Sequence, residues 1–494
     1  MTNQLSTEFG QTVNLQSKFA HVLQLWRESY LPEPLIALRA YISNAFDAYQ
    51  NDEFKPIRVD IEEGAIIISD QGRGMGREEL VKNFSIFGNK VARQDESCLG
   101  EFGIGRLSGF ALAQRIEIVS RQAESTHANR LLWLEGKNQM QLFEQEDAPQ
   151  GTSVKLVLKP QFLHLAKREA LEAYIRRTFA LLRKPILIGK GAEAINPSCE
   201  FVERSVRQAV KKDTAQAILW NKNEAQALLT NYYPQHQSLA NYVHTALDGS
   251  QIFLSVGPIS EVAETNGAQV FKKGVWVCET EDNFLPANFS FIKVLVNSPH
   301  LKLTATRNQL LPDDPIVHEL PAYLNKQVFS FFTLLANDQP HILQRILGQY
   351  RNQILAYAIS RLHWQHFLAQ HYRFCGLSAL MTWKDIVTKI SAKNAKSRLV
   401  LVNTTAELPD EYEAAVISNE DLERDFIHVL ATDTEVIIEE PDQNDPEVKE
   451  NIALKLYCVS LLHMAISQLH QLGAEEAQIS YLRHMCLQIQ TKPE

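Results

Sequence analysis

The chain has 494 residues, which exceeds what one hydrophobic core supports and predicts roughly three domains. A hydrophobic content of 45% and a charged content of 22% are typical of globular proteins, and the net charge of -9 gives no overall basic field for nucleic acid. No apolar run is long enough to cross a membrane and the first residues lack a signal-peptide pattern, so we expect a cytoplasmic protein with no membrane partner.

The first 160 residues alternate between helical and strand patterns. Apolar residues at helical spacing mark the helices, and short β-branched or alternating runs mark the strands. Helices are expected at 16–30, 34–50 and 77–87, with a further one after a glycine-rich stretch at 100–109, and strands at 64–70, 115–121 and 151–160. This order predicts an α+β fold in which strands pair around inserted helices.

Beyond residue 160 the pattern changes twice. A cationic helix is expected at 165–184, and strands return at 250–257, 269–279 and 289–297. The chain after 330 is mostly helical by pattern, apart from a strand at 397–403, an acidic loop or linker at 439–447 and an apolar helical stripe at 452–472. That stripe is equally typical of a core helix and of a dimer seam.

Two short motifs indicate a binding site. In ISNAFDA, Asn44 and Asp47 are three residues apart and share a helix face, and an Asn carbonyl oxygen is a suitable Mg²⁺ ligand. In SDQGRGM, a strand delivers Asp70 to its end, where Gly72 and Gly74 let the backbone turn and approach a ligand. A carboxylate at such a position can accept a hydrogen bond from the exocyclic amine of adenine.

Two further motifs fit the same site. In LGEFGIGRLSGFALA, three glycines precede a helix, whose free N–H groups and positive end can hold phosphates. Thr152 begins a strand and could support the adenine-binding Asp70. Each motif alone is weak, and the glycine pattern also suits a dinucleotide fold, although the acidic residue expected about 20 residues later is not evident. The four motifs in this order favour an ATP site.

The four motifs resemble those of the ATPase superfamily shared by gyrase, heat shock protein 90, histidine kinases and MutL, and within it heat shock protein 90 most closely. The resemblance implies an α+β fold with an N-terminal Bergerat-type ATPase sandwich, a split β-α-β middle domain and a mostly helical C-terminal region. It implies an ATP-binding domain at 1–185 with a short lid at 76–99, a middle domain at 186–330 and a C-terminal region of unknown role at 331–494.

The resemblance also implies roles for individual residues. Asn44 would hold Mg²⁺ and phosphate, with Asp47 on the same helix face, and Asp70 would bind adenine beside Gly74, Met75 and Thr152. Asn83 matches a residue that lines the family's nucleotide pocket. The phosphate loop would consist of Gly100, Phe102, Gly103, Ile104 and Gly105.

The likeness continues in residues 269–311, which resemble the middle domain of the same chaperones. In that family an Arg at the end of a loop reaches the terminal phosphate of the nucleotide, and Arg307 occupies the matching position. A guanidinium against developing phosphate charge accelerates phosphoryl transfer, whereas an ordinary domain-interface salt bridge is the alternative role for Arg307.

The sequence departs from the family at the residue that should activate water. The family has a Glu one helical turn before the motif Asn, and this chain has Ala40 there. Glu33 is eleven residues before Asn44, about 16 Å along a helix, and cannot substitute. Glu101 is the remaining nearby carboxylate and either approaches the γ-phosphate or points to solvent. Nucleotide binding is therefore expected, with slow hydrolysis.

Two functions follow from these observations. The first is a chaperone-like switch in which Mg-ATP closes the lid and docks the middle domain, acting on a protein client or partner subunit as a homodimer. The second is an ATP-gated nucleic-acid clamp of the MutL or MORC type, for which the basic helix at 165–184 is the support. A histidine kinase is disfavoured because no phosphoacceptor helix is evident.

The cysteines and histidines give no sign of a disulfide framework or a metal site. Six cysteines without a close pair argue against a disulfide framework and a cysteine zinc site. The histidines of LHWQHFLAQHY do not share one helical face at ligand spacing, so we expect no metal there.

Overall fold

The computed structural model describes most of the chain between residues 11 and 440. The described residues are 11–14, 34–49, 55–85, 108–137, 139–145, 148–191, 193–196, 198–259, 267–304, 308–377, 379–391, 398–403 and 414–440. The chain divides into two compact units, one of residues 1–285 with 290–331 and the other of 286–289 with 332–494. The helices expected at 16–30 and 452–472 lie outside the described residues, and the division at 185 and 330 stays a prediction.

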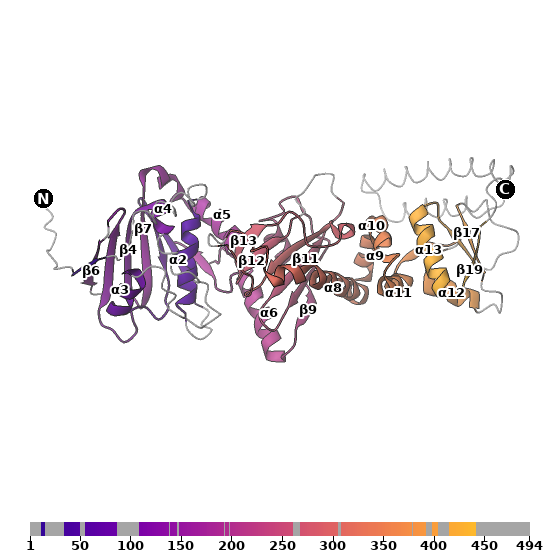
Figure 1. Cartoon of the computed structure of the whole chain (residues 1–494), viewed down its shortest axis with the longest axis horizontal. Helices are drawn as coiled ribbons and strands as arrows, with labels where there is room; N and C mark the ends of the chain where they lie inside the picture. The colour runs from indigo at the N-terminus through magenta and orange to yellow at the C-terminus, as the bar shows by residue number, and fades with distance from the viewer. Residues whose placement is uncertain are drawn as a thin grey trace. The chain divides into compact units, whose positions relative to one another are not determined.

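The first unit begins with an eight-stranded sheet in the order β1-β6-β5-β4-β7-β3-β2-β8 (Figure 1). Its strands are β1 Gln11–Asn14, β2 Ile57–Glu62, β3 Ala65–Ser69, β4 Ala113–Arg121, β5 Ala128–Leu134, β6 Gln139–Gln145, β7 Gly151–Leu158 and β8 Ile186–Ile188. All neighbours are antiparallel except β2 and β8. The sheet is therefore mixed, as expected for the ATPase sandwich.

Strands β4 and β7 alternate between buried and half-buried side chains, and helices cover the buried face of the sheet. They are α2 Ile36–Asp47, α3 Arg77–Ser85, α4 Gly109–Leu112 and α5 Arg168–Thr178. Apolar residues of α2, among them Leu38, Tyr41 and Ile42, share one core with inward residues of the strands such as Ile68 and Ile118. Burial of this stripe fixes which face of α2 remains available to a ligand.

A second sheet in the same unit has six strands in the order β13-β12-β14-β11-β10-β9. The strands are β9 Gln216–Leu219, β10 Ala240–Thr245, β11 Gln251–Val256, β12 Gln269–Lys272, β13 Val275–Glu279 and β14 Ile292–Asn297. The helices are α6 Cys199–Lys212, α7 Lys222–Leu229 and α8 Pro315–Asp338, the last of which continues into the second unit. Three expected strand regions, 250–257, 269–279 and 289–297, are confirmed.

The second unit is mainly helical, as expected. Its helices are α9 Pro340–Gln349, α10 Arg351–Ala358, α11 Leu362–His371, α12 Trp383–Ser391 and α13 Asp421–Asp433, and its strands are β15 Arg373–Cys375, β16 Leu380–Thr382, β17 Arg398–Val402, β18 Ala415–Ile417 and β19 Ile437–Glu439. An aromatic core of Phe289, Phe332, Tyr357 and Trp364 holds the helices together. The strand expected at 397–403 is β17, the middle strand of a parallel sheet.

The structure corrects the length of the cationic helix expected at 165–184. A 3-10 helix, Pro160–Leu165, precedes α5, and Lys167 between them is extended, with φ -123° and ψ 143°. The helix then ends at Thr178. No helix among the described residues is long and apolar enough to cross a membrane.

Candidate nucleotide site

Three neighbouring strands present polar side chains at the same edge of the large sheet. Strands β3 and β4 end at this edge, and the antiparallel strand β7 begins there. Asp70 follows β3, Thr152 lies at the start of β7, and Ser120 lies near the end of β4, directly opposite Thr152. Each polar residue is two positions from a buried core residue, such as Ile68 before Asp70 and Ile118 before Ser120. Because strand side chains alternate, all three lie on the helix-covered face.

Asp70 is held by two backbone donors. Its Oδ1 accepts hydrogen bonds from the N–H of Gly72 at 2.8 Å and of Thr152 at 3.2 Å, and its own N–H donates to the carbonyl oxygen of Thr152 at 2.9 Å. The side chain is 8% exposed. Among the described residues, Oδ2 accepts no hydrogen bond and therefore remains available to a ligand donor.

Burial raises the pKa of Asp70 to about 6, although the N–H groups of Gly72 and Thr152 act in the opposite direction. The folded protein therefore holds a proton here more tightly than the unfolded chain does. The unliganded fold gains relative stability as the pH falls through about 6, and the ionised acceptor is lost over the same interval.

If Asp70 accepts from adenine in its ionised form, we expect adenosine affinity to be nearly full at pH 7 and to fall about tenfold between pH 7 and pH 5. NMR titrations with adenosine at several pH values measure this affinity. Adenosine is used because it carries no phosphate group that titrates in this range. Affinity that stays constant from pH 7 to pH 5 would contradict the assignment of Asp70 as the acceptor.

Glycines let the backbone approach closely around Asp70. Gly74 has φ +66°, and a Cβ there would lie 2.0 Å from the carbonyl oxygen of Arg121. A Cβ at Gly72 would lie 2.5 Å from the carbonyl oxygen of Ala48 at the end of α2. No L-residue with a side chain fits these positions without moving the backbone, so the two motif glycines are structurally required.

The loop after Asp70 is tied to the end of α2. The N–H of Arg73 donates to the carbonyl oxygen of Ala48 at 3.0 Å. The N–H of Gln71 donates to the Tyr49 hydroxyl at 3.0 Å, and that hydroxyl donates to the carbonyl oxygen of Pro56 at 2.8 Å. The sequence analysis did not identify Tyr49, and no motif in the chain distinguishes it from an ordinary aromatic helix end.

Helix α2 presents its uncovered face beside this loop. Asn44 is exposed, Asp47 is half-buried, and Ala40 lies one turn before Asn44 on the same face with a half-buried methyl group. Mg²⁺ is commonly held by one or two protein oxygens together with phosphates and waters, so a single exposed Asn amide fits such an ion. The helix offers no carboxylate at position 40.

Met75, five residues after Asp70, and Asn83 of α3 lie in contact with each other. The Asn83 Nδ2 group contacts the Met75 sulfur at 3.4 Å, and Met75 also packs against the domain core. The N–H of Met75 donates to Ser120 Oγ at 2.8 Å. Ser120 is the second residue that was not predicted, since an alternating strand indicates that it faces inward but not that it lies opposite Thr152.

The remaining predicted site residues lie outside the described residues. These are the lid from residue 86 onward, the phosphate loop with Gly100, Glu101, Phe102, Gly103, Ile104 and Gly105, and Arg307. Their roles stay predictions.

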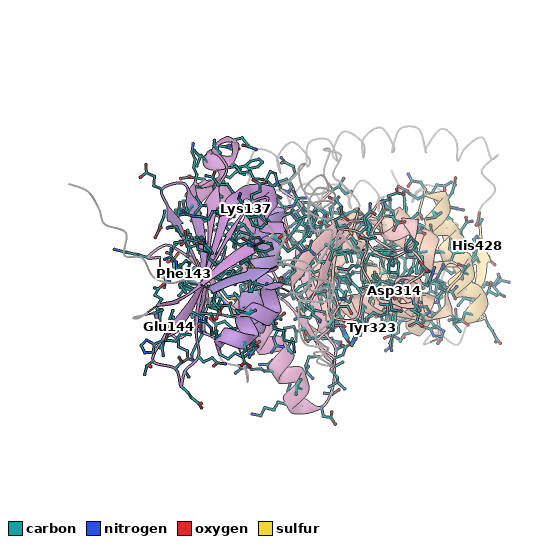
Figure 2. The ribbon with its side chains drawn as sticks, turned by 60° about the vertical axis from the view of Figure 1, so that its left-hand side comes forward. Lys137, Phe143, Glu144, Asp314, Tyr323 and His428 are labelled. Atoms are coloured by element: carbon teal, nitrogen blue, oxygen red, sulfur yellow. The ribbon has the colours of Figure 1, made fainter. Side chains whose placement is uncertain are left out.

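The residues on either side of Arg307 form a closed hairpin. The N–H of Leu311 donates to the carbonyl oxygen of Lys302 at 3.0 Å, and the N–H of Thr304 donates to that of Gln309 at 3.1 Å. Asp314, labelled in Figure 2, holds the base of this hairpin. Its Oδ2 accepts a hydrogen bond from the N–H of Lys302 at 2.7 Å. Its Oδ1 accepts from the N–H of Ile316 at 3.2 Å and so caps α8.

We expect Asp314→Ala to destabilise the protein by about 1 to 3 kcal/mol, because it removes the acceptor of the Lys302 N–H and the cap of α8. Asp314 is 1% exposed. Chemical denaturation measures the loss, and Asp313→Ala is the matched control since Asp313 is exposed. Equal stability of the two variants would show that Asp314 does not secure the hairpin.

Most cations around α5 are engaged within the protein. Five of the seven basic residues between 159 and 184 contact other groups: Lys159 with Glu135, Arg168 with Glu172, Arg177 with Trp276, Arg183 with Glu203, and Lys184 with Tyr49. The basic helix is therefore a weaker candidate for a nucleic-acid surface than its composition indicates.

Comparison with known proteins agrees with this geometry. Residues 33–159 match the family model described as histidine kinase-, DNA gyrase B-, and HSP90-like ATPase. The chain is 25% identical over 384 residues to chaperone protein HtpG of Polaromonas naphthalenivorans (strain CJ2), covering 69% of this chain and 61% of that protein. It is 24% identical over 376 residues to chaperone protein HtpG of Legionella pneumophila (strain Paris), covering 69% and 60%.

The chain spans about three fifths of the length of these curated relatives. The matched family segment contains the strands and helices that bring Asn44, Asp70 and Thr152 to one edge of the sheet. Residues 33–159 therefore form a domain of the histidine kinase-, DNA gyrase B-, and HSP90-like ATPase type, and the chain is similar over 69% of its length to chaperone protein HtpG.

Proposed function

We propose that the chain binds Mg-ATP at the edge of the large sheet and works as a chaperone-like conformational switch. ATP closes the lid at 76–99 and docks the middle domain, which lies within 186–330. The switch acts on a protein client or partner subunit, in a homodimer. The coupling of nucleotide to shape requires that ATP bind one conformation better than the other.

The observation that carries the proposal is the environment of Asp70. A nearly buried carboxylate keeps Oδ2 available, beside a half-buried Thr152 hydroxyl and two glycines that admit a ligand closely. This arrangement suits the amine and ring nitrogen of adenine. Asn44 lies on the exposed face of α2, whose last residues are bonded to the same loop.

The phosphates extend from the base pocket towards Asn44 and the glycine-rich loop. Mg²⁺, when bound, neutralises phosphate charge, and Asn44 supplies one oxygen to it. The backbone N–H groups of the loop at 100–105 hold phosphate oxygens. Arg307 stabilises the terminal phosphate from a hairpin whose base Asp314 secures.

Hydrolysis is slow because the position of the family's general base on α2 is occupied by Ala40. A methyl group at position 40 can neither orient nor deprotonate a water molecule, and a general base contributes roughly a hundredfold to ten-thousandfold in rate. ATP-bound states are therefore long-lived. Glu101 is the group to examine if turnover is nevertheless measurable.

The nucleic-acid clamp is the weaker alternative. Its support was the basic segment around α5, and the internal contacts of Lys159, Arg177 and Arg183 reduce that support. Binding to DNA that declines steeply with salt would restore it.

Calorimetry with ATP and Mg²⁺ tests the proposed site. Asp70→Asn is expected to weaken ATP binding by about a hundredfold, because it replaces an ionised acceptor with an amide. Asp60→Asn is the matched control, since Asp60 lies in β2 of the same sheet and takes no part in the site. Equal binding by both variants, or no binding by the natural chain, would overturn the proposal.

A further inference from the structure

Ser120 of β4 contacts both Thr152 of β7 and the segment that follows Asp70. It is fully buried, its Oγ accepts the Met75 N–H at 2.8 Å, and it lies 2.9 Å from Thr152 Oγ1. The Gly151 carbonyl oxygen is a second possible acceptor at 3.3 Å. Ser120 thus connects the Thr152 hydroxyl with the backbone of Met75.

The Thr152 hydroxyl can face a ligand either as a hydrogen-bond donor or as an acceptor. A hydroxyl has one proton to donate and two lone pairs to accept with. When Ser120 donates to Thr152, the Thr152 proton is free to point at a ligand. When Ser120 donates to Gly151, Thr152 donates to Ser120 and offers a ligand only its lone pairs. The shorter separation, 2.9 Å against 3.3 Å, favours the first arrangement.

A donor at Thr152 beside an acceptor at Asp70 matches one class of base. Adenine presents an amine and an adjacent ring nitrogen acceptor, which pair with Asp70 and Thr152 respectively. A 6-oxopurine presents a carbonyl oxygen and an adjacent N–H, so both of its groups face the wrong partner. Unpaired polar groups in a buried site are strongly unfavourable, and this makes the site selective.

We propose that Ser120 is a specificity-determining positioning residue: by donating its proton to Thr152 it makes that hydroxyl a donor and selects 6-aminopurine over 6-oxopurine nucleotides. The proposal rests on the proposed function, since it concerns the same site. It does not require hydrolysis, Arg307 or the phosphate loop.

The test is the ratio of ATP affinity to inosine triphosphate affinity, measured by calorimetry. Ser120→Ala is expected to reduce this ratio about threefold to tenfold, the range for one hydrogen bond, because Thr152 can then turn to accept from the N–H of a 6-oxopurine. Ser120→Cys keeps the volume with a weak donor and is expected to change the ratio in the same direction. Thermal unfolding checks that each variant is folded.

Thr152→Val provides the decisive control. If Ser120 acts through Thr152, adding Ser120→Ala to Thr152→Val leaves the ratio unchanged. A purely structural role, through the Met75 N–H, would weaken both nucleotides alike and leave the ratio at its natural value in every background. An unchanged ratio in Ser120→Ala and Ser120→Cys, or an equal change with and without the Thr152 hydroxyl, overturns this inference. Failure of the natural chain to bind ATP overturns the proposed function instead, and this inference with it.

Discussion

Ala40→Glu is expected to hydrolyse ATP about a hundredfold faster than the natural chain, the lower end of what a general base contributes. Residue 40 is half-buried on the uncovered face of α2, one turn before the exposed Asn44. A Glu there would place a carboxylate beside the region where we propose the terminal phosphate lies. Steady-state phosphate release at saturating ATP measures the effect.

Ala40→Gln is the control for this prediction. It has nearly the same size and polarity as Glu but cannot take a proton, so its turnover is expected to stay at the natural level. ATP binding should be similar in all three proteins. If Ala40→Glu binds ATP and is no faster than Ala40→Gln, the missing carboxylate is not what limits hydrolysis.

Gly151→Ala is expected to destabilise the protein by about 3 kcal/mol or more and to weaken ATP binding roughly tenfold to a hundredfold. Gly151 has φ +112°, and a Cβ there would lie 2.1 Å from the carbonyl oxygen of Asp70. The backbone of β7 would have to move away from Asp70, which breaks the bond from the Thr152 N–H to Oδ1. Denaturation and calorimetry on one preparation measure both effects.

Gly136→Ala is the control that distinguishes the effect of the close contact at Gly151 from the effect of a positive φ alone. Gly136 also has a positive φ, +72°, but a Cβ there would meet nothing within 4 Å. We expect a stability loss of about 1 kcal/mol and unchanged ATP binding. If both variants bind ATP as the natural chain does, the close approach at Gly151 does not shape the site.

The position of Asp70 could be predicted because its signal is local. In residues 64–74, a β-branched strand followed by Asp and two glycines specifies a strand end, a sharp turn and a carboxylate. The pairing of Asn44 with Asp47 was predicted for a similar reason, since helical spacing alone puts residues three apart on one face. Local sequence patterns of this kind predict a residue's position without information on its tertiary contacts.

Ser120 and Tyr49 could not be predicted because their roles arise from pairing across the chain. Ser120 matters through its register opposite Thr152, 32 residues away, and Tyr49 through bonds to Gln71 and Pro56. A serine in a strand and a tyrosine at a helix end are common. Only the order of the strands brings these groups to the site.

The small sheet of the second unit was missed for a different reason. β18 and β19 have three residues each, too short for an alternating pattern to be distinguished from a helix end or a loop. The expected strand at 397–403 was recognisable because its apolar run is longer. The two strands that pair with it, β18 and β19, were identified only from the structure.

A single-turnover experiment tests the central claim most directly. The natural chain in excess is mixed with radiolabelled ATP and Mg²⁺, and the bound nucleotide is analysed over time. We predict that bound nucleotide remains ATP for many times longer than in Ala40→Glu, in which it becomes ADP. Conversion in the natural chain as fast as in Ala40→Glu would contradict the account of a slowly hydrolysing, ATP-gated switch.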